Sequence, residues 1–185
     1  IGSQNDKEKI NDLVNFGDKT LGKTVVVCND SPGFLGNRVG VYAMQVAMTE
    51  AFNFGLTVEE ADAVFGRPLG IPKTGIFGLY DLIGIDLMAD VLKSFISELP
   101  SSDPFHKVGK ELPIINQLIS DGYTGRKGKG GFFRMNKSSD IKILESLNYK
   151  DNTYLESKKV DLGLPDVMDV KTVIERDDVY GKYAW

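Results

Sequence analysis

The spacing of hydrophobic positions predicts helices along most of this 185-residue chain. The segment from about Leu35 to Asn53 contains no proline and is apolar around most of its circumference, which is typical of a helix packed on several sides. Thr57-Val-Glu-Glu60 is a capping box, so a second helix should run from about 58 to Phe65. The body of the chain, about 34–122, is therefore predicted to be all helical.

Turn residues divide the rest of this body into further elements. The glycine and proline spacing from Gly70 to Gly78 predicts a loop. Asp86 is placed to cap a helix that Pro100 would end, and Pro113 suits the first position of another helix. Beyond the helical body, a short helix is expected over Ser139–Leu147, followed by an acidic stretch that is typical of a solvated extension or linker.

The first 28 residues have a different character from the helical body. A polar helical stretch, Asp6–Thr20, is followed by the β-branched run Thr24–Cys28, which predicts a helix and then a strand. Both faces of that strand are apolar, so it should be buried in a parallel sheet whose other strands the chain does not visibly supply. Residues 1–28 are therefore expected to be the last helix and strand of a truncated α/β domain.

The amino-acid composition limits which kinds of partner and ligand the chain can be expected to bind. Lys and Arg number 22 against 26 Asp and Glu, and the net charge of −4 gives no overall field for binding nucleic acid. The single cysteine, Cys28, cannot form an internal disulfide, and with the single histidine, His106, it cannot make a structural zinc site. We expect no metal and a reducing, cytoplasmic compartment. No apolar run approaches the ~20 residues that span a bilayer, and no signal-peptide layout is visible.

Few side chains are candidates for catalysis when each is judged from the residues next to it in the sequence. His106 lies in a polar loop and is expected to face solvent, and Cys28 should be a small buried hydrophobe. Asp81 and Asp86 lie at a junction between a turn and a helix, where capping explains both better than a glycosidase-type pair. Asn37 opens the long helix from Leu35; a helix cap is the simpler interpretation, although its amide could also point into an adjoining α/β domain.

A basic, glycine-rich stretch runs from Tyr123 to Ser139 and contains five lysines and arginines without an acid. Such a loop could bind phosphate. The dinucleotide-binding fingerprint, however, requires its glycines between a strand and a helix, and here they follow a helix and precede Phe132 and Phe133. A solvated basic loop therefore remains the simpler alternative.

Several ordered motifs resemble those of the L-3-hydroxyacyl-CoA dehydrogenases over about residues 17–134. The motifs that carry the resemblance are Asp30-Ser-Pro-Gly-Phe-Leu-Gly-Asn-Arg38, Glu50-Ala51 with Gly55-Leu-Thr-Val-Glu-Glu-Ala-Asp62, Gly70-Ile-Pro72, Leu79-Tyr-Asp-Leu-Ile-Gly-Ile-Asp86 and Gly125-Arg-Lys-Gly-Lys-Gly-Gly-Phe-Phe133. The resemblance implies a mainly α fold, a helical bundle similar to the 6-phosphogluconate dehydrogenase C-terminal domain, with a short α/β remnant of a Rossmann domain at the N-terminus.

The same resemblance implies three parts along the chain. Residues 1–28 would end a truncated NAD-binding domain, residues 29–135 would be the C-terminal helical domain, and residues 136–185 would be an extension or linker toward a second repeat. Gly70-Ile-Pro-Lys-Thr-Gly-Ile-Phe77 is most similar to the long multifunctional members of fatty acid β-oxidation, in which a dehydrogenase is fused to an enoyl-CoA hydratase.

Members of this family move a hydride between C3 of a (S)-3-hydroxyacyl-CoA and NAD. Their catalytic histidine and its glutamate lie on the NAD-binding domain, so the resemblance implies that this chain alone is inactive. The expected partners are the acyl-CoA substrate, the chain's own NAD-binding domain and a second helical repeat, with a homodimer left open. By resemblance, Asn37 is the catalytic contact to the acyl thioester region and Lys127 is the residue that contacts NAD.

Two other functions stay open at this point. The chain could be the helical domain of another Rossmann-plus-helical dehydrogenase that acts on a small hydroxy acid. It could also be a helical interaction module without a catalytic half, although an orphan helix and a buried-type strand at 1–28 argue against that interpretation.

Overall fold

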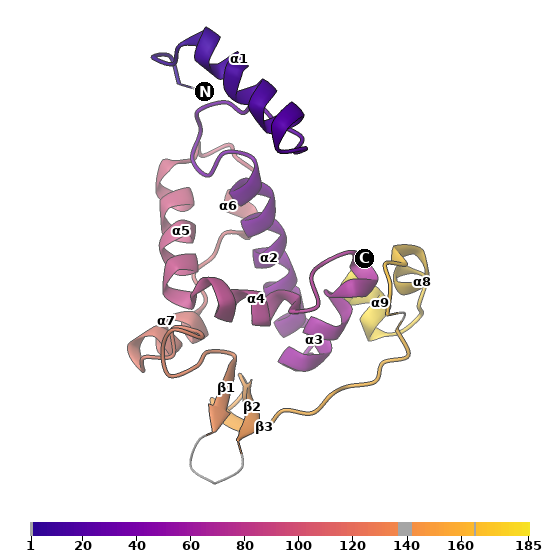
Figure 1. Cartoon of the computed structure of the whole chain (residues 1–185). Helices are drawn as coiled ribbons and strands as arrows, with labels where there is room; N and C mark the ends of the chain where they lie inside the picture. The colour runs from indigo at the N-terminus through magenta and orange to yellow at the C-terminus, as the bar shows by residue number, and fades with distance from the viewer. Residues whose placement is uncertain (1, 137–141, 165) are drawn as a thin grey trace. The chain divides into compact units, whose positions relative to one another are not determined.

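The structure is a computed structural model that describes residues 2–136, 142–164 and 166–185 (Figure 1). The chain divides into two compact units, Ile1–Gly40 and Val41–Trp185. Within the described residues, no helix is long and apolar enough to cross a membrane.

The first unit contains a capped helix and an extended segment. Helix α1 spans Lys7–Asn15, begins where the Asp6 side chain accepts a hydrogen bond from the Glu8 amide, and continues into a π-helical turn, η1, over Phe16–Thr20. The strand expected over 24–28 is not formed, because no described segment pairs with it, and the run is largely exposed. Cys28 is accordingly half-buried rather than a buried core residue.

The helical body is confirmed as mainly α. Helix α2 begins in the first unit and continues into the second, and short connections join it to the helices that follow (Figure 1). The elements of this body are α2 (Gly36–Asn53), α3 (Val58–Val64), the 3₁₀ turn η2 (Arg67–Leu69), α4 (Gly75–Ile83), α5 (Ile85–Glu98), α6 (Phe105–Val108) and α7 (Pro113–Ser120).

The predicted helix ends are confirmed where local chemistry decides them. The Thr57 hydroxyl accepts from the Glu60 amide at 3.2 Å, and the Glu60 carboxylate accepts from the Thr57 amide at 2.9 Å, which completes the capping box of α3. Pro113 occupies the first position of α7 as predicted, since its missing N–H would have no partner there.

Two expectations within the body are wrong. The loop expected over 70–78 ends early, because α4 begins at Gly75. Asp86 does not precede α5: that helix begins at Ile85 directly after Gly84, whose φ of +113° redirects the chain between α4 and α5. Asp86 therefore lies inside the first turn of α5.

A small antiparallel sheet follows the helical body. Strands β1 (Phe133–Asn136), β2 (Ile143–Asn148) and β3 (Thr153–Glu156) are ordered β1-β2-β3, with Phe133 opposite Ser146. The helix expected over 139–147 is therefore wrong from residue 143 onward, and residues 139–141 lie outside the described part. Pairing with β1 and the cross-strand ion pair between Arg134 and Glu145 at 2.7 Å override the local helical pattern.

Two short helices lie near the C-terminus, of which the second packs on α2 and α3 and the first on η2. They are α8 (Val170–Ile174) and α9 (Val179–Ala184). The Tyr183 hydroxyl donates to the Ala47 carbonyl at 3.0 Å, and the Tyr180 hydroxyl donates to the Glu60 carboxylate at 2.8 Å. The segment 136–185, expected as an extension or linker, thus contains two strands and two docked helices. Whether it leads toward a second repeat stays a prediction.

Helix α4 lies at the centre of the second unit, between α3 and α5 and next to β1 (Figure 1). Its Phe77 ring meets the Phe132 ring edge-on with the ring centroids 4.6 Å apart, and Tyr80 also contacts Phe132. The Tyr80 hydroxyl donates to the Gln45 side chain on α2 at 3.2 Å. The core thus joins α4 to the start of the sheet and to α2.

Candidate functional site

The glycine-rich stretch forms a closed turn between α7 and β1. We call Gly125–Gly131 the basic turn. The Gly125 amide donates to the Gly130 carbonyl at 2.8 Å, and the two residues form an isolated β-bridge. Arg126 and Lys127 lie exposed on this turn. The glycines close a turn that leads into a strand instead of opening a helix, so this stretch is not a dinucleotide-binding loop of the fingerprint type.

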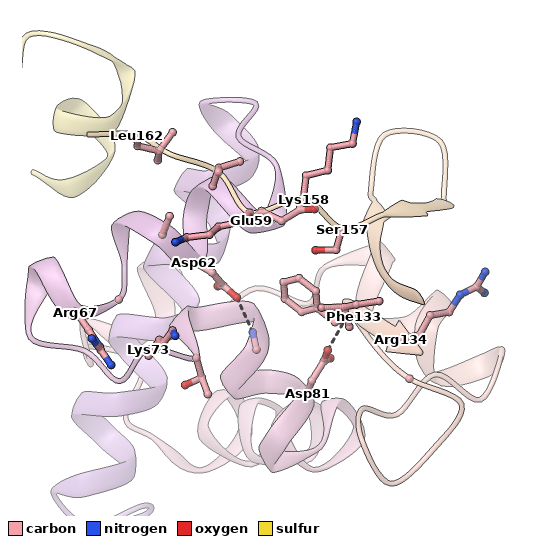
Figure 2. Close-up of a pocket in the computed structure, with 18 of the residues that line it drawn as sticks. Glu59, Asp62, Arg67, Lys73, Asp81, Phe133, Arg134, Ser157, Lys158 and Leu162 are labelled. Atoms are coloured by element: carbon pink, nitrogen blue, oxygen red, sulfur yellow. Dashed lines mark hydrogen bonds between the residues drawn. The ribbon is translucent and has the colours of Figure 1, made fainter. Parts of the chain in front are cut away.

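The carboxylate of Asp81 anchors the end of the basic turn. One oxygen accepts from the Phe132 amide at 2.8 Å, and the other accepts from the Phe133 amide at 2.7 Å (Figure 2). Only 3% of the Asp81 surface is exposed, and this burial raises the pKa of Asp81 to about 6. Asp81 was expected to cap a helix, but it binds the backbone of a segment 51 residues away.

The close approach between α4 and the basic turn requires glycine at two positions. A Cβ atom at Gly131 would lie 1.9 Å from an Asp81 carboxylate oxygen, and one at Gly125 would lie 2.4 Å from the Asp81 carbonyl oxygen. No side chain fits at such distances, so these glycines allow Asp81 to reach the backbone of the turn.

Lys127 forms an ion pair with Asp86 of α5. The Lys127 Nζ atom lies 2.8 Å from Asp86 Oδ1, and 54% and 37% of the two side chains are exposed. The bond from Lys127 holds the pKa of the Asp86 carboxyl below its usual range. A Cβ atom at Gly84 would lie 3.0 Å from Lys127 Nζ, so the ammonium lies directly over this glycine.

A second acid, the half-buried Asp62 of α3, binds the first turn of α4 through its carboxylate. It accepts from the Phe77 amide at 2.7 Å and from the Gly78 amide at 2.9 Å (Figure 2). These bonds satisfy N–H groups that a helix leaves without partners at its start, which explains why α4 begins inside the expected loop. Burial outweighs them and raises the pKa of Asp62 to about 7.

Sequence reasoning assigned no role to Asp62 and missed the role of Asp81, although the helical spacing carried a signal. Asp62 follows Val58 by four residues, and Asp81 follows Phe77 by four. Both acids therefore share a helix face with core residues. An acid on the apolar face of a helix needs buried hydrogen-bond donors, and here backbone amides supply them.

Asp62 and Asp81 both line an open hollow in the second unit. The hollow has a volume of about 1300 Å³ and is bounded by α3, α4, the basic turn, β1 and the chain around 157–164. Figure 2 shows the carboxylates of Asp62 and Asp81 directed toward the backbone, whereas Lys158 and Arg134 point away from the hollow. Within the described residues, the carboxylates of Asp62 and Asp81 are thus engaged in structural bonds, and neither Lys158 nor Arg134 offers its charge to the hollow.

Stability should fall with rising pH because of Asp62. Its folded-state pKa of about 7 lies above the ordinary 3.8, so the folded chain binds the proton more tightly than the unfolded chain. The contribution of Asp62 to the free energy of unfolding should therefore decrease as pH rises from about 4 to about 7 and then level off. Asp81, with a pKa of about 6, contributes with the same sign.

The contribution of Asp62 can be measured by denaturant unfolding at about pH 5 and at about pH 8. The wild-type chain and Asp62→Asn are compared at both pH values. The pH slope should be smaller in Asp62→Asn than in the wild type. Asp90→Asn, on an exposed position of α5, is the control and should keep the wild-type slope. An unchanged slope in Asp62→Asn would contradict the prediction.

The remaining candidates from the sequence belong to other elements than the basic turn. Asn37 is an exposed residue within the first turn of α2, not the cap that precedes it, and it belongs to the first unit. His106 is half-buried, with Nε2 3.2 Å from the Leu99 carbonyl oxygen at the end of α5, so the expectation of a solvent-facing side chain is wrong. Among the residues described, no group of three His, Cys, Asp or Glu side chains could hold a metal ion.

Comparison with known proteins identifies the family. The family model described as 3-hydroxyacyl-CoA dehydrogenase, C-terminal domain, matches residues 33–135. The chain belongs to this family. The resemblance expected from the ordered motifs is thereby confirmed, and so is the mainly helical fold of this C-terminal domain.

Relatives and solved structures agree with this membership. A putative fatty acid oxidation complex trifunctional enzyme of Rickettsia felis is 41% identical over 175 residues, which are 95% of this chain and 24% of that protein. The mitochondrial hydroxyacyl-coenzyme A dehydrogenase of Homo sapiens is 30% identical over 122 residues, 66% of this chain and 37% of that protein. The crystal structure of M. tuberculosis FadB2 matches with a TM-score of 0.55 and 25% identity, covering 70% of this chain and 43% of that one.

The chain therefore spans about a quarter of the length of the Rickettsia felis relative. The matched range of the 3-hydroxyacyl-CoA dehydrogenase C-terminal domain contains Asn37, Asp62, Asp81, Asp86 and Lys127. Every contact that fixes the basic turn to α4 and α5 thus lies inside the family domain.

Proposed function

We propose that this chain is the substrate-side and assembly domain of an NAD-dependent 3-hydroxyacyl-CoA dehydrogenase of fatty acid β-oxidation. The reaction oxidises a (S)-3-hydroxyacyl-CoA to the 3-oxoacyl-CoA. The observation that carries the proposal is the family match over residues 33–135, supported by 41% identity to a relative named for fatty acid oxidation. The much greater length of that relative supports an NAD-binding domain and a second helical repeat as partners, with a homodimer as the alternative.

NAD supplies the hydride acceptor when it is bound. The exposed ammonium of Lys127 suits one of its anionic groups, because a lysine has three N–H donors and Asp86 occupies one of them. The basic turn is not a fingerprint loop, so the proposal assigns most of the dinucleotide contacts to the NAD-binding domain and a single cationic contact to this chain.

Asn37 is the proposed catalytic contact of this chain. Its amide is exposed in the first turn of α2 and offers both donors and an acceptor. As the hydride and proton move, negative charge develops on the oxygen of the enolate-like 3-oxo product. A fixed amide donor at that oxygen stabilises the transition state more than the ground state.

The general base is proposed to lie outside this chain. The single histidine, His106, is engaged at the end of α5, where its ring lies against the Leu99 carbonyl. Without a base and a dinucleotide-binding loop, binding energy alone does not accelerate the reaction, so the chain by itself is expected to be inactive.

A single cysteine suits a reducing compartment, and the proposal places the enzyme in the cytoplasm.

The first test is the oxidation of NADH by the complete protein that contains this chain, with acetoacetyl-CoA or free acetoacetate as the acceptor. Activity with the CoA ester alone supports the proposal, and activity with free acetoacetate would favour a hydroxy-acid dehydrogenase instead. The isolated 185-residue chain is the control. A turnover in the isolated chain comparable to that of the complete protein would refute the proposal that the general base and the dinucleotide-binding loop lie outside this chain.

A further inference from the structure

The backbone around Lys127 is fixed to the junction of α4 and α5 at several points. We call residues 81–87 the α4–α5 corner. The Arg126 amide donates to the Asp81 carbonyl at 2.8 Å, and the Ile85 amide donates to the Thr124 carbonyl at 3.2 Å. The Asp81 carboxylate holds the far end of the basic turn through two further amides. The Cα atom of Lys127 is therefore held in place from both sides.

The side chain of Lys127 needs a separate restraint, because its four-carbon stem can adopt many rotamers. Asp86 provides that restraint at 2.8 Å from the ammonium, and Gly84 leaves the space through which the stem passes. Asp86 itself is fixed in the first turn of α5, where its carboxylate also accepts from the Leu87 amide at 2.9 Å. The ion pair is thus built onto a rigid helix start.

Large hydrophobic side chains of the α4–α5 corner lie at the surface. Leu82, Ile83 and Leu87 of the same corner are all exposed, although each is a large hydrophobic side chain. A ligand that covered this corner would exclude water from it, and contacts between an ammonium and an anion are stronger where water is excluded.

We infer that Asp86 is a positioning residue for Lys127, holding its ammonium where the two remaining N–H donors can bind an anionic group of the dinucleotide. The inference rests on the proposed function, since it assumes that Lys127 contacts NAD. Both partners are more than a third exposed, and such pairs contribute only about 0–1 kcal/mol. The expected effect is therefore a modest change in affinity and not a loss of folding.

The test is a fluorescence titration of NADH with the complete protein that contains this chain, without substrate. Asp86→Asn should weaken NADH binding about threefold to fivefold, and Lys127→Ala about tenfold. In the Lys127→Ala background, Asp86→Asn should cause no further change, because there is no ammonium left to position. Asp90→Asn, which makes the same charge change on an exposed position of α5, should bind NADH as the wild type does.

Each other outcome is decisive. If Lys127→Ala weakens binding but Asp86→Asn does not, or if Asp86→Asn tightens it, the positioning inference fails while the proposed function stands. If Asp86→Asn has the same effect with and without Lys127, its role is structural and the inference also fails. If Lys127→Ala itself binds NADH normally, the assignment of Lys127 to the cofactor fails and the inference fails with it.

Discussion

Replacement of Asn37 by alanine in the complete protein should lower kcat by about 10²-fold or more with acetoacetyl-CoA and NADH. The expected loss is large because a fixed amide donor acts on charge that develops only in the transition state. Stability should change little, since Asn37 is exposed and lies within the first turn of α2. Steady-state kinetics with thermal unfolding of the same samples separates the two effects.

Asn53→Ala is the matched control for this experiment. It removes the same side chain from the exposed C-terminal end of the same helix, and it should leave kcat unchanged. Asn37→Asp adds a second comparison, because it keeps an acceptor but loses the N–H donors. If Asn37→Ala lowers the unfolding temperature but not kcat, Asn37 supports the helix and takes no part in the reaction.

Replacement of Asp81 by alanine should lower the free energy of unfolding of the second unit by about 2–4 kcal/mol. The variant leaves the amides of Phe132 and Phe133 without their acceptors in a buried site. Removal of the Asp81 carboxylate also removes the cost of keeping a charged group in a buried site, and this gain offsets part of the loss. The raised pKa of Asp81 has the same cause, since burial disfavours the charged form. The two lost bonds outweigh that gain, because each unsatisfied buried donor costs about 1–3 kcal/mol.

Denaturant unfolding of this chain measures the loss. Asp81→Asn keeps one acceptor oxygen and should fall between the wild type and the alanine variant. Asp90→Ala, at an exposed position of α5, should stay within about 0.5 kcal/mol of the wild type. The prediction is contradicted if Asp81→Ala loses no more free energy of unfolding than the control Asp90→Ala. Water would then replace the carboxylate as acceptor without cost.

Local signals in the sequence were sufficient to predict that the body of the chain is helical. The capping box at Thr57 and the proline at position 113 each act within one turn, so their effect does not depend on distant residues. The ordered motifs were sufficient for the family, because a fixed order of several short segments is far more specific than any one of them.

Long-range partners decided what the sequence could not show. The β-pairing of Phe133 with Ser146 replaced the expected helix, and the start of α4 depends on Asp62, which is 13 residues earlier than Gly75. The ion pair of Lys127 with Asp86 joins positions 41 residues apart. Such contacts become visible only when the chain is folded, since no local periodicity specifies which acid meets which base.

The extended run around Val25–Val27 in the first unit affects how the isolated chain behaves in concentrated solution. Val25, Val26 and Val27 are 40%, 60% and 60% exposed, and no strand pairs with them in the described part of the chain. Consecutive β-branched residues with open backbone groups are a template for intermolecular β-addition. Concentrated preparations of the chain by itself should therefore form oligomers through this segment, and a charged substitution at Val26 should keep them dispersed.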